Sequence, residues 1–216
     1  MDAYIAGLGL LAAASVGLVL LGGRASEGTR RELRARIASW WGIAAALGVA
    51  GALLFLPLLA LSAAAWCAGE AARVLRARPG LAAVGSLGFG AGVASLAWLP
   101  PERIAFVLAA VWVSDVAQHA VGKLAGRTPF APRLSPNKTW EGTGAGLAAG
   151  TLAGWALGAP WLGLACAVAG IAGGLAASAL KRSAGAKDWG RALPGHGGLL
   201  DRLDGVAAAA PLVLLI

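Results

Sequence analysis

Cysteine, histidine and acidic residues are scarce in this chain. Its 216 residues include two cysteines, two histidines and ten aspartates and glutamates. Cys67 and Cys166 lie in apolar stretches, with no CxxC motif and no Cys/His cluster, so the sequence implies neither a disulfide framework nor a zinc site. We expect both to be buried as small hydrophobic residues. A phosphate loop of the form GxxxxGK[ST] is also absent, so bound phosphate would have to be held in another way.

Charged residues are few as well. They make up 13% of the chain, against 58% hydrophobic residues, and the mean hydropathy is +0.74. Soluble domains carry about 25% charged residues, so this composition indicates a membrane protein. The formal charge of +8 falls in short segments between apolar runs and not in a basic tail. That distribution is typical of cytoplasmic loops and argues against nucleic acid as a partner.

Seven apolar stretches alternate with the polar segments. A bilayer core of about 30 Å needs about 20 apolar residues per helix, and lipid demands that the backbone satisfy its own hydrogen bonds. Basic segments flank the longest stretch on both sides, so we expect a tight helical hairpin turning near Pro57. The stretches are 3–22, 39–75, 80–99, 103–122, 143–159, 160–180 and 205–216.

The sequence therefore predicts an all-α integral membrane protein, a polytopic bundle of about seven to eight transmembrane helices. We expect residues 3–22 to form a retained transmembrane helix, because no basic region precedes them and Asp2 is acidic where a signal peptide would be positive. The positive-inside rule places residues 122–138 and 181–205 in the cytoplasm and the turn at Gly158 on the far side.

Glycine recurs every four residues along one predicted helix. Gly142, Gly146, Gly150, Gly154 and Gly158 lie on one face, where small residues let two helix backbones approach closely. We interpret this face as a packing surface inside the membrane, and it is equally compatible with a homodimer.

Two polar residues interrupt the apolar stretch 103–122. Asp115 would lie inside a membrane helix, where an unpaired charge is costly, so a functional role is its default interpretation. His119 lies four residues further on and shares that helix face. A role in the site and a role in packing both remain open for His119.

The densest polar segment is residues 181–205. Asp201 and Asp204 are three residues apart, so both carboxylates lie on one helix face, and Asp188 precedes them in the loop. Carboxylates without Cys and with few His suit magnesium. A metal held by carboxylates among fixed cations is what phosphoryl or nucleotidyl transfer requires. The surrounding cations are Lys181, Arg182, Lys187, Arg191 and Arg202.

An ordinary cytoplasmic loop would explain some of these cations but not the sequence PGHGGLLDRLD. Pro194 fixes the backbone where the loop begins, and Gly195, Gly197 and Gly198 permit positive φ or close backbone approach. We interpret this segment as a loop that is shaped around a ligand.

Two blocks of the sequence carry a family resemblance. Residues 178–204, SALKRSAGAKDWGRALPGHGGLLDRLD, closely resemble the signature of the phosphatidate cytidylyltransferase (CDP-diacylglycerol synthase) family, and every fixed position is met. Residues 114–142, SDVAQHAVGKLAGRTPFAPRLSPNKTWEG, look like the upstream motif of the same family. Together the blocks cover about a quarter of the chain.

The resemblance implies an integral membrane enzyme that joins CTP to phosphatidate, giving CDP-diacylglycerol and pyrophosphate. Its polar active-site cavity would face the cytoplasm from the bacterial inner membrane. Residues 1–100 would supply N-terminal transmembrane helices and residues 101–216 a catalytic transmembrane domain. The expected partners are CTP, phosphatidate or a related lipid phosphate, and membrane lipids.

The resemblance also implies roles for individual residues. Asp188, Asp201, Asp204 and Lys187 would be catalytic. The three aspartates would bind Mg²⁺, with Asp115 as a further acidic member of the site and room for a second cation. The expected substrate-binding residues are Ser135, Lys138, Thr139, Trp140, Glu141, Lys181, Arg182, His196 and Arg202.

Three alternatives stay open at this point. SDVAQH lacks the small residue and the tyrosine that commonly follow the aspartate in the family, which leaves room for another lipid phosphate as acceptor. A CTP-dependent polyprenol-type lipid kinase would release CDP instead of pyrophosphate. A non-catalytic scaffold or transporter should have lost carboxylates from the signature, and here Asp188, Asp201 and Asp204 are all present.

Overall fold

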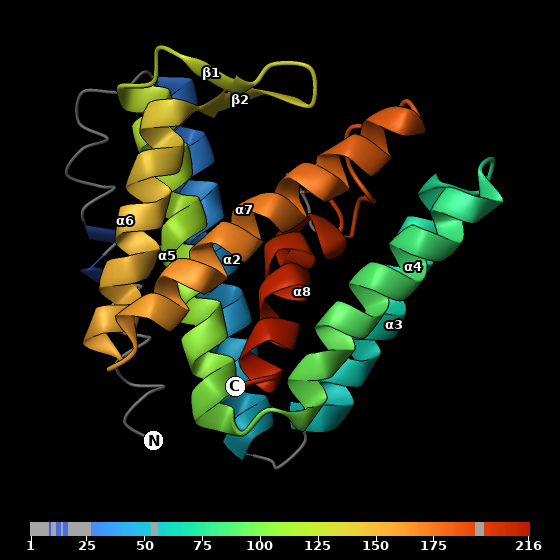
Figure 1. The fold of residues 1–216 in the computed structure, drawn as a ribbon, viewed down its shortest axis with the longest axis horizontal. Helices are drawn as coiled ribbons and strands as arrows, with labels where there is room; N and C mark the ends of the chain where they lie inside the picture. Colours follow the sequence, from blue (N-terminus) through green and yellow to red (C-terminus); the bar gives the residue numbers. More distant parts are fainter. Residues whose placement is uncertain (1–8, 10–11, 14, 17–26, 53–55, 193–196) are drawn as a thin grey trace.

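The computed structural model describes residues 9, 12–13, 15–16, 27–52, 56–192 and 197–216. It is mostly helical, with one short β-hairpin (Figure 1). The elements are α2 (Glu27–Ala52), α3 (Leu56–Val74), α4 (Pro79–Ala94), the 3-10 helix η2 (Ser95–Trp98), α5 (Pro101–Leu124), β1 (Pro129–Ala131), β2 (Ser135–Thr139), α6 (Trp140–Ala156), α7 (Pro160–Ser183) and α8 (Leu200–Leu214).

The helical membrane architecture is confirmed. Three helices among the described residues are long and apolar enough to cross a bilayer, namely Pro79–Trp98, Pro101–Leu124 and Pro160–Ser183, with mean hydropathies of 1.6, 1.6 and 1.8. The chain is therefore an integral membrane protein with a helical core.

Three such helices are fewer than the seven to eight crossings that the sequence predicts. The number of spanning helices is lower because some of the observed helices are too short or too polar to cross a bilayer. α6 has 17 residues and α8 has 15, both short of the roughly 20 that a crossing needs. α3 has 19 residues but carries Glu70 and Arg73. Most of the expected helix at 3–22 lies outside the described residues.

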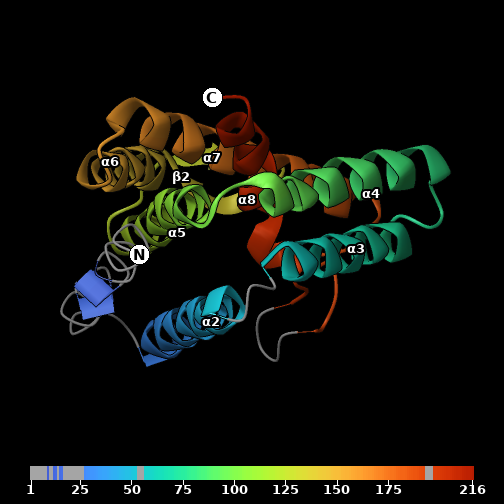
Figure 2. The same cartoon turned by 90° about the horizontal axis from the view of Figure 1, so that it is seen from below.

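The stretch 39–75 contains the second half of α2 and the whole of α3, and residues 53–55 between them lie outside the described residues. The two helices are not the tight hairpin that the sequence predicts. α3 lies side by side with α4 in both views (Figures 1 and 2). α2 instead reaches α5 through Trp40, whose ring centroid lies 4.5 Å from that of Trp112.

Proline sets where three of the helices begin. Pro79, Pro101 and Pro160 are the first residues of α4, α5 and α7. Proline suits this position because the first helical N–H has no partner within the helix. The turn between α6 and α7 is confirmed at Gly158, whose φ of +81° favours glycine.

The polar connections collect at one end of the helical bundle. The α3–α4 turn, the β-hairpin and the end of α7 lie toward the upper end of Figure 1, and the start of α5 and the α6–α7 turn lie toward the lower end. Exposed tryptophans lie near both ends, as interfacial belts do. Trp98, Trp155 and Trp161 belong to the lower end, and Trp140 follows the hairpin at the upper end. The segments predicted to share one side of the membrane therefore do lie together.

The glycine stripe packs inside the chain. A Cβ added at Gly142 or Gly146 would come within 3.0 Å of main-chain atoms of α5, and one at Gly154 would lie 2.6 Å from the Cα of Gly163 in α7. The predicted packing face is confirmed for Gly142, Gly146, Gly150 and Gly154, which bring the backbones of α5, α6 and α7 together. Gly158 is not part of it, because α6 ends at Ala156 and a Cβ added at Gly158 would meet no atom of the described residues within 4 Å. Because the stripe is used within the chain, it lends no support to a homodimer.

A feature that the sequence did not predict is the antiparallel hairpin of β1 and β2, which pairs Pro129 with Thr139. Its strands have three and five residues and no alternating apolar pattern, so they give little signal. The hairpin leads directly into α6, where the Thr139 hydroxyl accepts a hydrogen bond from the N–H of Gly142 at 3.1 Å and caps the helix.

Candidate active site

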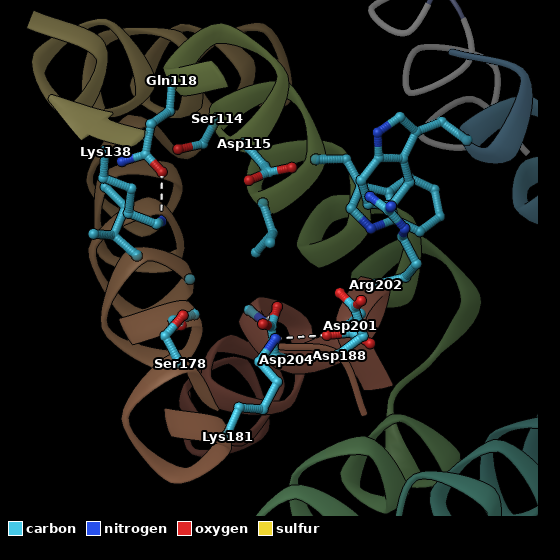
Figure 3. Close-up of a pocket in the computed structure, with 17 residues that line it drawn as sticks. Ser114, Asp115, Gln118, Lys138, Ser178, Lys181, Asp188, Asp201, Arg202 and Asp204 are labelled. Carbon is cyan, nitrogen blue, oxygen red and sulfur yellow. Dashed lines mark hydrogen bonds and ion pairs between the residues drawn. The ribbon is translucent and has the colours of Figure 1, made fainter. Parts of the chain in front are cut away.

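A polar cavity of about 230 Å³ opens among α5, β2, α7 and the start of α8. Figure 3 shows its polar side chains turned toward one another across the opening. Four carboxylates and three cations line it, so the lining carries one formal negative charge. These residues are Asp115, Asp188, Asp201, Asp204, Lys138, Lys181 and Arg202.

Asp201 organises one wall of this cavity. Its Oδ1 accepts a hydrogen bond from Lys181 Nζ at 2.6 Å, in an ion pair whose side chains are 9% and 11% exposed. Its Oδ2 accepts hydrogen bonds from the backbone N–H groups of Trp189 and Gly198, both at 2.8 Å. Asp201 therefore joins α7 and the loop to the first turn of α8, and both of its oxygens are already engaged.

Glycine is required beside Asp201. Gly197 has a φ of +82°, and a Cβ there would lie 2.7 Å from Asp201 Oδ2. The glycine-rich loop is thus shaped around a carboxylate of the protein itself.

Asp204 occupies the next position on the same face of α8. Its Oδ1 accepts a hydrogen bond from the N–H of Gly205 at 2.7 Å. The charges that act on it come from Lys181, Lys138 and Asp115, which belong to three other elements. A Cβ added at Gly174 would lie 3.9 Å from Asp204 Oδ2 and 3.6 Å from Lys138 Nζ, so that glycine keeps the space between them open.

Lys138 is held in the cavity by a short polar chain. Its ammonium donates to Gln118 Oε1 at 2.7 Å, and Gln118 Nε2 in turn donates to Thr143 Oγ1 at 3.2 Å. Gln118 and Thr143 are both buried. β2, α5 and α6 therefore cooperate to place one cation opposite Asp204.

The other residues of the upstream block that were predicted to bind substrate lie outside the cavity lining. Thr139 caps α6, and Ser135 sits in β2. Trp140 is exposed and makes an edge contact with Phe130, with ring centroids 4.6 Å apart. Of the predicted residues in this block, Asp115 and Lys138 are the two that line the described cavity.

Glu141, in the first turn of α6, connects this helix to the start of the β-hairpin. Its carboxylate accepts hydrogen bonds from the backbone N–H of Thr128, at 3.2 and 3.3 Å, and from the Thr128 hydroxyl at 3.0 Å. Backbone hydrogen bonds, chiefly from its own N–H, lower the pKa of Glu141 to about 2.

Several predicted residues of the C-terminal block also lie apart from the lining. Lys187 and Arg182 are exposed, and Arg182 donates to the carbonyl of Ala186. His196 lies outside the described residues. His119 is half-buried and is not part of the lining, which favours its role in packing. The substrate and catalytic roles of these residues stay predictions.

The donor set bears on the expected metal. Across the described residues, no group of three or more His, Cys, Asp or Glu side chains is arranged to hold a metal ion by itself. Magnesium usually takes one or two carboxylates, and waters and substrate phosphates complete its shell. Asp115 in α5 and Asp204 in α8 line the cavity from different helices, so they could supply two such carboxylates.

Sequence reasoning missed four residues that the structure brings to the site. Ser114, Gln118 and Ser178 line the cavity, and Glu70 holds the loop from α3. The spacing of Gln118, three residues after Asp115, was a usable signal for one helix face. Nothing in the local sequence links Glu70 to a segment 130 residues away.

The fold and the cavity together define a class of protein: a helical membrane protein whose helices enclose a polar cavity lined by four carboxylates and three cations. The chain belongs to the cytidylyltransferase family, whose sequence profile matches residues 36–216.

Curated relatives support this assignment. The chain is 43% identical over 122 residues to a phosphatidate cytidylyltransferase of Brucella suis, a match that covers 52% of this chain and 45% of the relative. It is 42% identical over 122 residues to the phosphatidate cytidylyltransferase of Mycobacterium leprae, covering 50% and 38% of the two chains. The match thus spans less than half the length of these relatives.

Proposed function

We propose that this chain transfers CMP from CTP to phosphatidate, giving CDP-diacylglycerol and pyrophosphate. The observation that carries the proposal is the cavity in which Lys138, Lys181 and Arg202 stand among carboxylates at the edge of apolar helices. Relatives named phosphatidate cytidylyltransferase are 43% and 42% identical to this chain over matched stretches of 122 residues.

In the proposed reaction, a phosphate oxygen of the lipid attacks the α-phosphorus of CTP. A new P–O bond forms, and the bond from the α-phosphorus to pyrophosphate breaks. A phosphate monoester is already largely deprotonated at neutral pH, so no general base is needed. Positioning and charge neutralisation should supply most of the rate.

The cations have separable tasks in this scheme. Lys138 reaches the cavity from β2, and Gln118 fixes its ammonium. Lys181 comes from α7 and is held by Asp201, which leaves it oriented but partly neutralised. We assign Lys138 and Arg202 to the triphosphate and the lipid phosphate, and Lys181 mainly to the architecture of the wall.

We propose Mg²⁺ as the cofactor, held by Asp115 and Asp204. A bound divalent cation would supply a Lewis acid for the phosphate oxygens. The lining carries one negative charge without it, so a cation is needed before the cavity can take up a strongly anionic nucleotide.

We further propose that the cavity faces the cytoplasm of a bacterial inner membrane. The basic α3–α4 turn, the hairpin and the end of α7 gather at one end of the bundle, as the positive-inside rule expects of a cytoplasmic face. α3, α6 and α8 pack against the three long helices and would share the bilayer with them.

The test is incubation of purified protein with Mg²⁺, phosphatidate and CTP labelled at the α-phosphate. We expect label in the lipid phase and release of pyrophosphate. Transfer of label from the γ-phosphate, with release of CDP, would show a lipid kinase and contradict the proposal. Label in neither form, from folded protein, would exclude phosphatidate as the acceptor.

The metal assignment needs its own comparison. Asp204→Asn and Asp115→Asn should each raise the Mg²⁺ concentration required for half-maximal activity, and chelation should abolish activity reversibly. Glu102→Gln is the matched control, because Glu102 is exposed at the start of α5, away from the cavity. An unchanged Mg²⁺ requirement in both aspartate variants would remove them from the metal site.

A further inference from the structure

Glu70 is a buried carboxylate that belongs to none of the motifs. It lies in α3 with 1% of its surface exposed. Its Oε2 accepts a hydrogen bond from the N–H of Leu200 at 2.8 Å, and its Oε1 accepts one from the N–H of Leu199 at 3.2 Å. The indole of Trp66 donates to Oε1 at 3.1 Å.

These bonds supply what α8 lacks. The first N–H groups of a helix have no partner within it, and α8 has no capping side chain of its own at Leu199. Glu70 provides the cap from another helix. A negative group at that position also interacts favourably with the helix dipole.

Two glycines before α8 leave just enough space for this carboxylate. A Cβ added at Gly198 would lie 2.5 Å from Glu70 Oε2, and one at Gly190 would lie 2.8 Å from Oε1. Asp201 accepts its own hydrogen bond from the N–H of Gly198. Two carboxylates, one from α3 and one from α8, thus accept hydrogen bonds from the backbone of the same short segment, residues 198–200.

These hydrogen bonds lie directly beside three residues that line the cavity. Asp201 and Arg202 follow Leu200 immediately, and Asp204 lies one helical turn on. Any shift of the first turn of α8 moves all three in the cavity. A carboxylate inside a membrane protein is costly to maintain, and an ordinary helix cap on α8 itself would have been enough for stability alone.

We propose that Glu70 is a positioning residue, which fixes the first turn of α8 and thereby sets Asp201, Arg202 and Asp204 in the cavity. The inference rests on the proposed function for its catalytic part. Its structural part, the fixing of the turn, stands on the hydrogen bonds alone.

The decisive variant is Glu70→Gln. A glutamine keeps the shape but offers a single oxygen acceptor, and its amide group would face an N–H donor. We expect faster hydrogen exchange of the amides of Leu199 and Leu200, with exchange in α5 and α6 unchanged. With an active wild type, kcat should fall about 10- to 100-fold, the usual cost of losing a group that orients a site.

Two further variants guard against a trivial loss of folding. Gly198→Ala removes no polar group but forces a methyl against the Glu70 carboxylate, and it should reproduce both effects. Trp66→Phe removes one donor and leaves both backbone bonds, so exchange and kcat should stay near those of the wild type. Glu102→Gln serves as the charge control.

The outcomes separate the two proposals. Unchanged exchange at Leu199 and Leu200 in Glu70→Gln overturns the inference whatever the activity. Faster exchange with unchanged kcat overturns the positioning role, because the turn would then be held for stability alone. A wild type that transfers no label refutes the proposed function, while the exchange result still decides whether Glu70 fixes the turn.

Discussion

The buried ion pair of Lys181 and Asp201 permits a quantitative test by a double-mutant cycle. Its atoms are 2.6 Å apart, and the side chains are 11% and 9% exposed. At an effective dielectric constant of about 20, the gross attraction is about 6 kcal/mol, and desolvation offsets much of it. Removing one partner leaves the other charge buried, which costs about 3–5 kcal/mol. Asp201→Asn and Lys181→Met should each destabilise the protein on that scale.

The double variant should be more stable than the sum of the singles predicts. In Asp201→Asn alone, the amide oxygen can accept from the N–H groups of Trp189 and Gly198 only by turning its NH₂ toward the ammonium. Lys181→Met removes that conflict. We expect a coupling of about 2 kcal/mol or more in favour of the double variant, a magnitude that contacting residues reach.

The assay is unfolding in detergent, followed by circular dichroism, with label transfer measured on the same samples. The double variant should recover stability but not activity, because Asp201 also holds the loop and the start of α8. Additive losses of stability would refute the reasoning, since they would mean that the two charges do not depend on each other. Full activity in Asp201→Asn would refute the role of the carboxylate in the site.

Three other predictions follow from single contacts. Gly92→Ala should destabilise the protein by about 1–3 kcal/mol in the same unfolding assay, because its Cβ would overlap the main chain of α8. Gly88 has open space around it, so Gly88→Ala should be neutral or stabilising, and equal effects of the two variants would contradict this prediction. Gln118→Ala should lower kcat/KM about tenfold or more without loss of folding, since it removes the acceptor of Lys138, and an unchanged value would show that this lysine needs no orientation. Because its pKa is lowered from 4.5 to about 2, the Glu141 carboxylate stabilises the fold above pH 4.5, and this stability is lost as the pH falls through about 2. The thermal stability of Glu141→Gln should therefore fall less than that of the wild type over this pH range, and equal falls in both proteins would refute the role of the carboxylate.

The sequence predicted best where physics acts locally. Pro160 and Gly158 marked a turn, the glycine spacing marked a packing face, and Asp115 stood out as a carboxylate in an apolar stretch. Asp201 and Asp204 do share one face of α8, as their spacing required.

What the sequence missed depends on contacts between distant segments. The cap that Glu70 gives to α8 joins residues 129 and 130 positions apart, which no local pattern encodes. Thr139 and Glu141 belong to the upstream block, yet the structure uses them to cap α6 and tie it to the hairpin. A conspicuous motif therefore mixes residues that face the cavity with residues that hold the chain around it.

The glycine face of α6 also determines how the site can vary. Gly142 and Gly146 bring α6 against the main chain of α5, the helix that carries Asp115 and Gln118. α6 follows β2 directly, so this contact also sets the position of Lys138. The distance between α5 and α6, and with it the position of Lys138 relative to Asp115 and Gln118, is thus fixed by contacts of main-chain atoms, which have no alternative rotamers. Heating or repacking of neighbouring side chains should leave this spacing unchanged, and adjustment for a different ligand would have to come from the opposite wall, at α7 and α8.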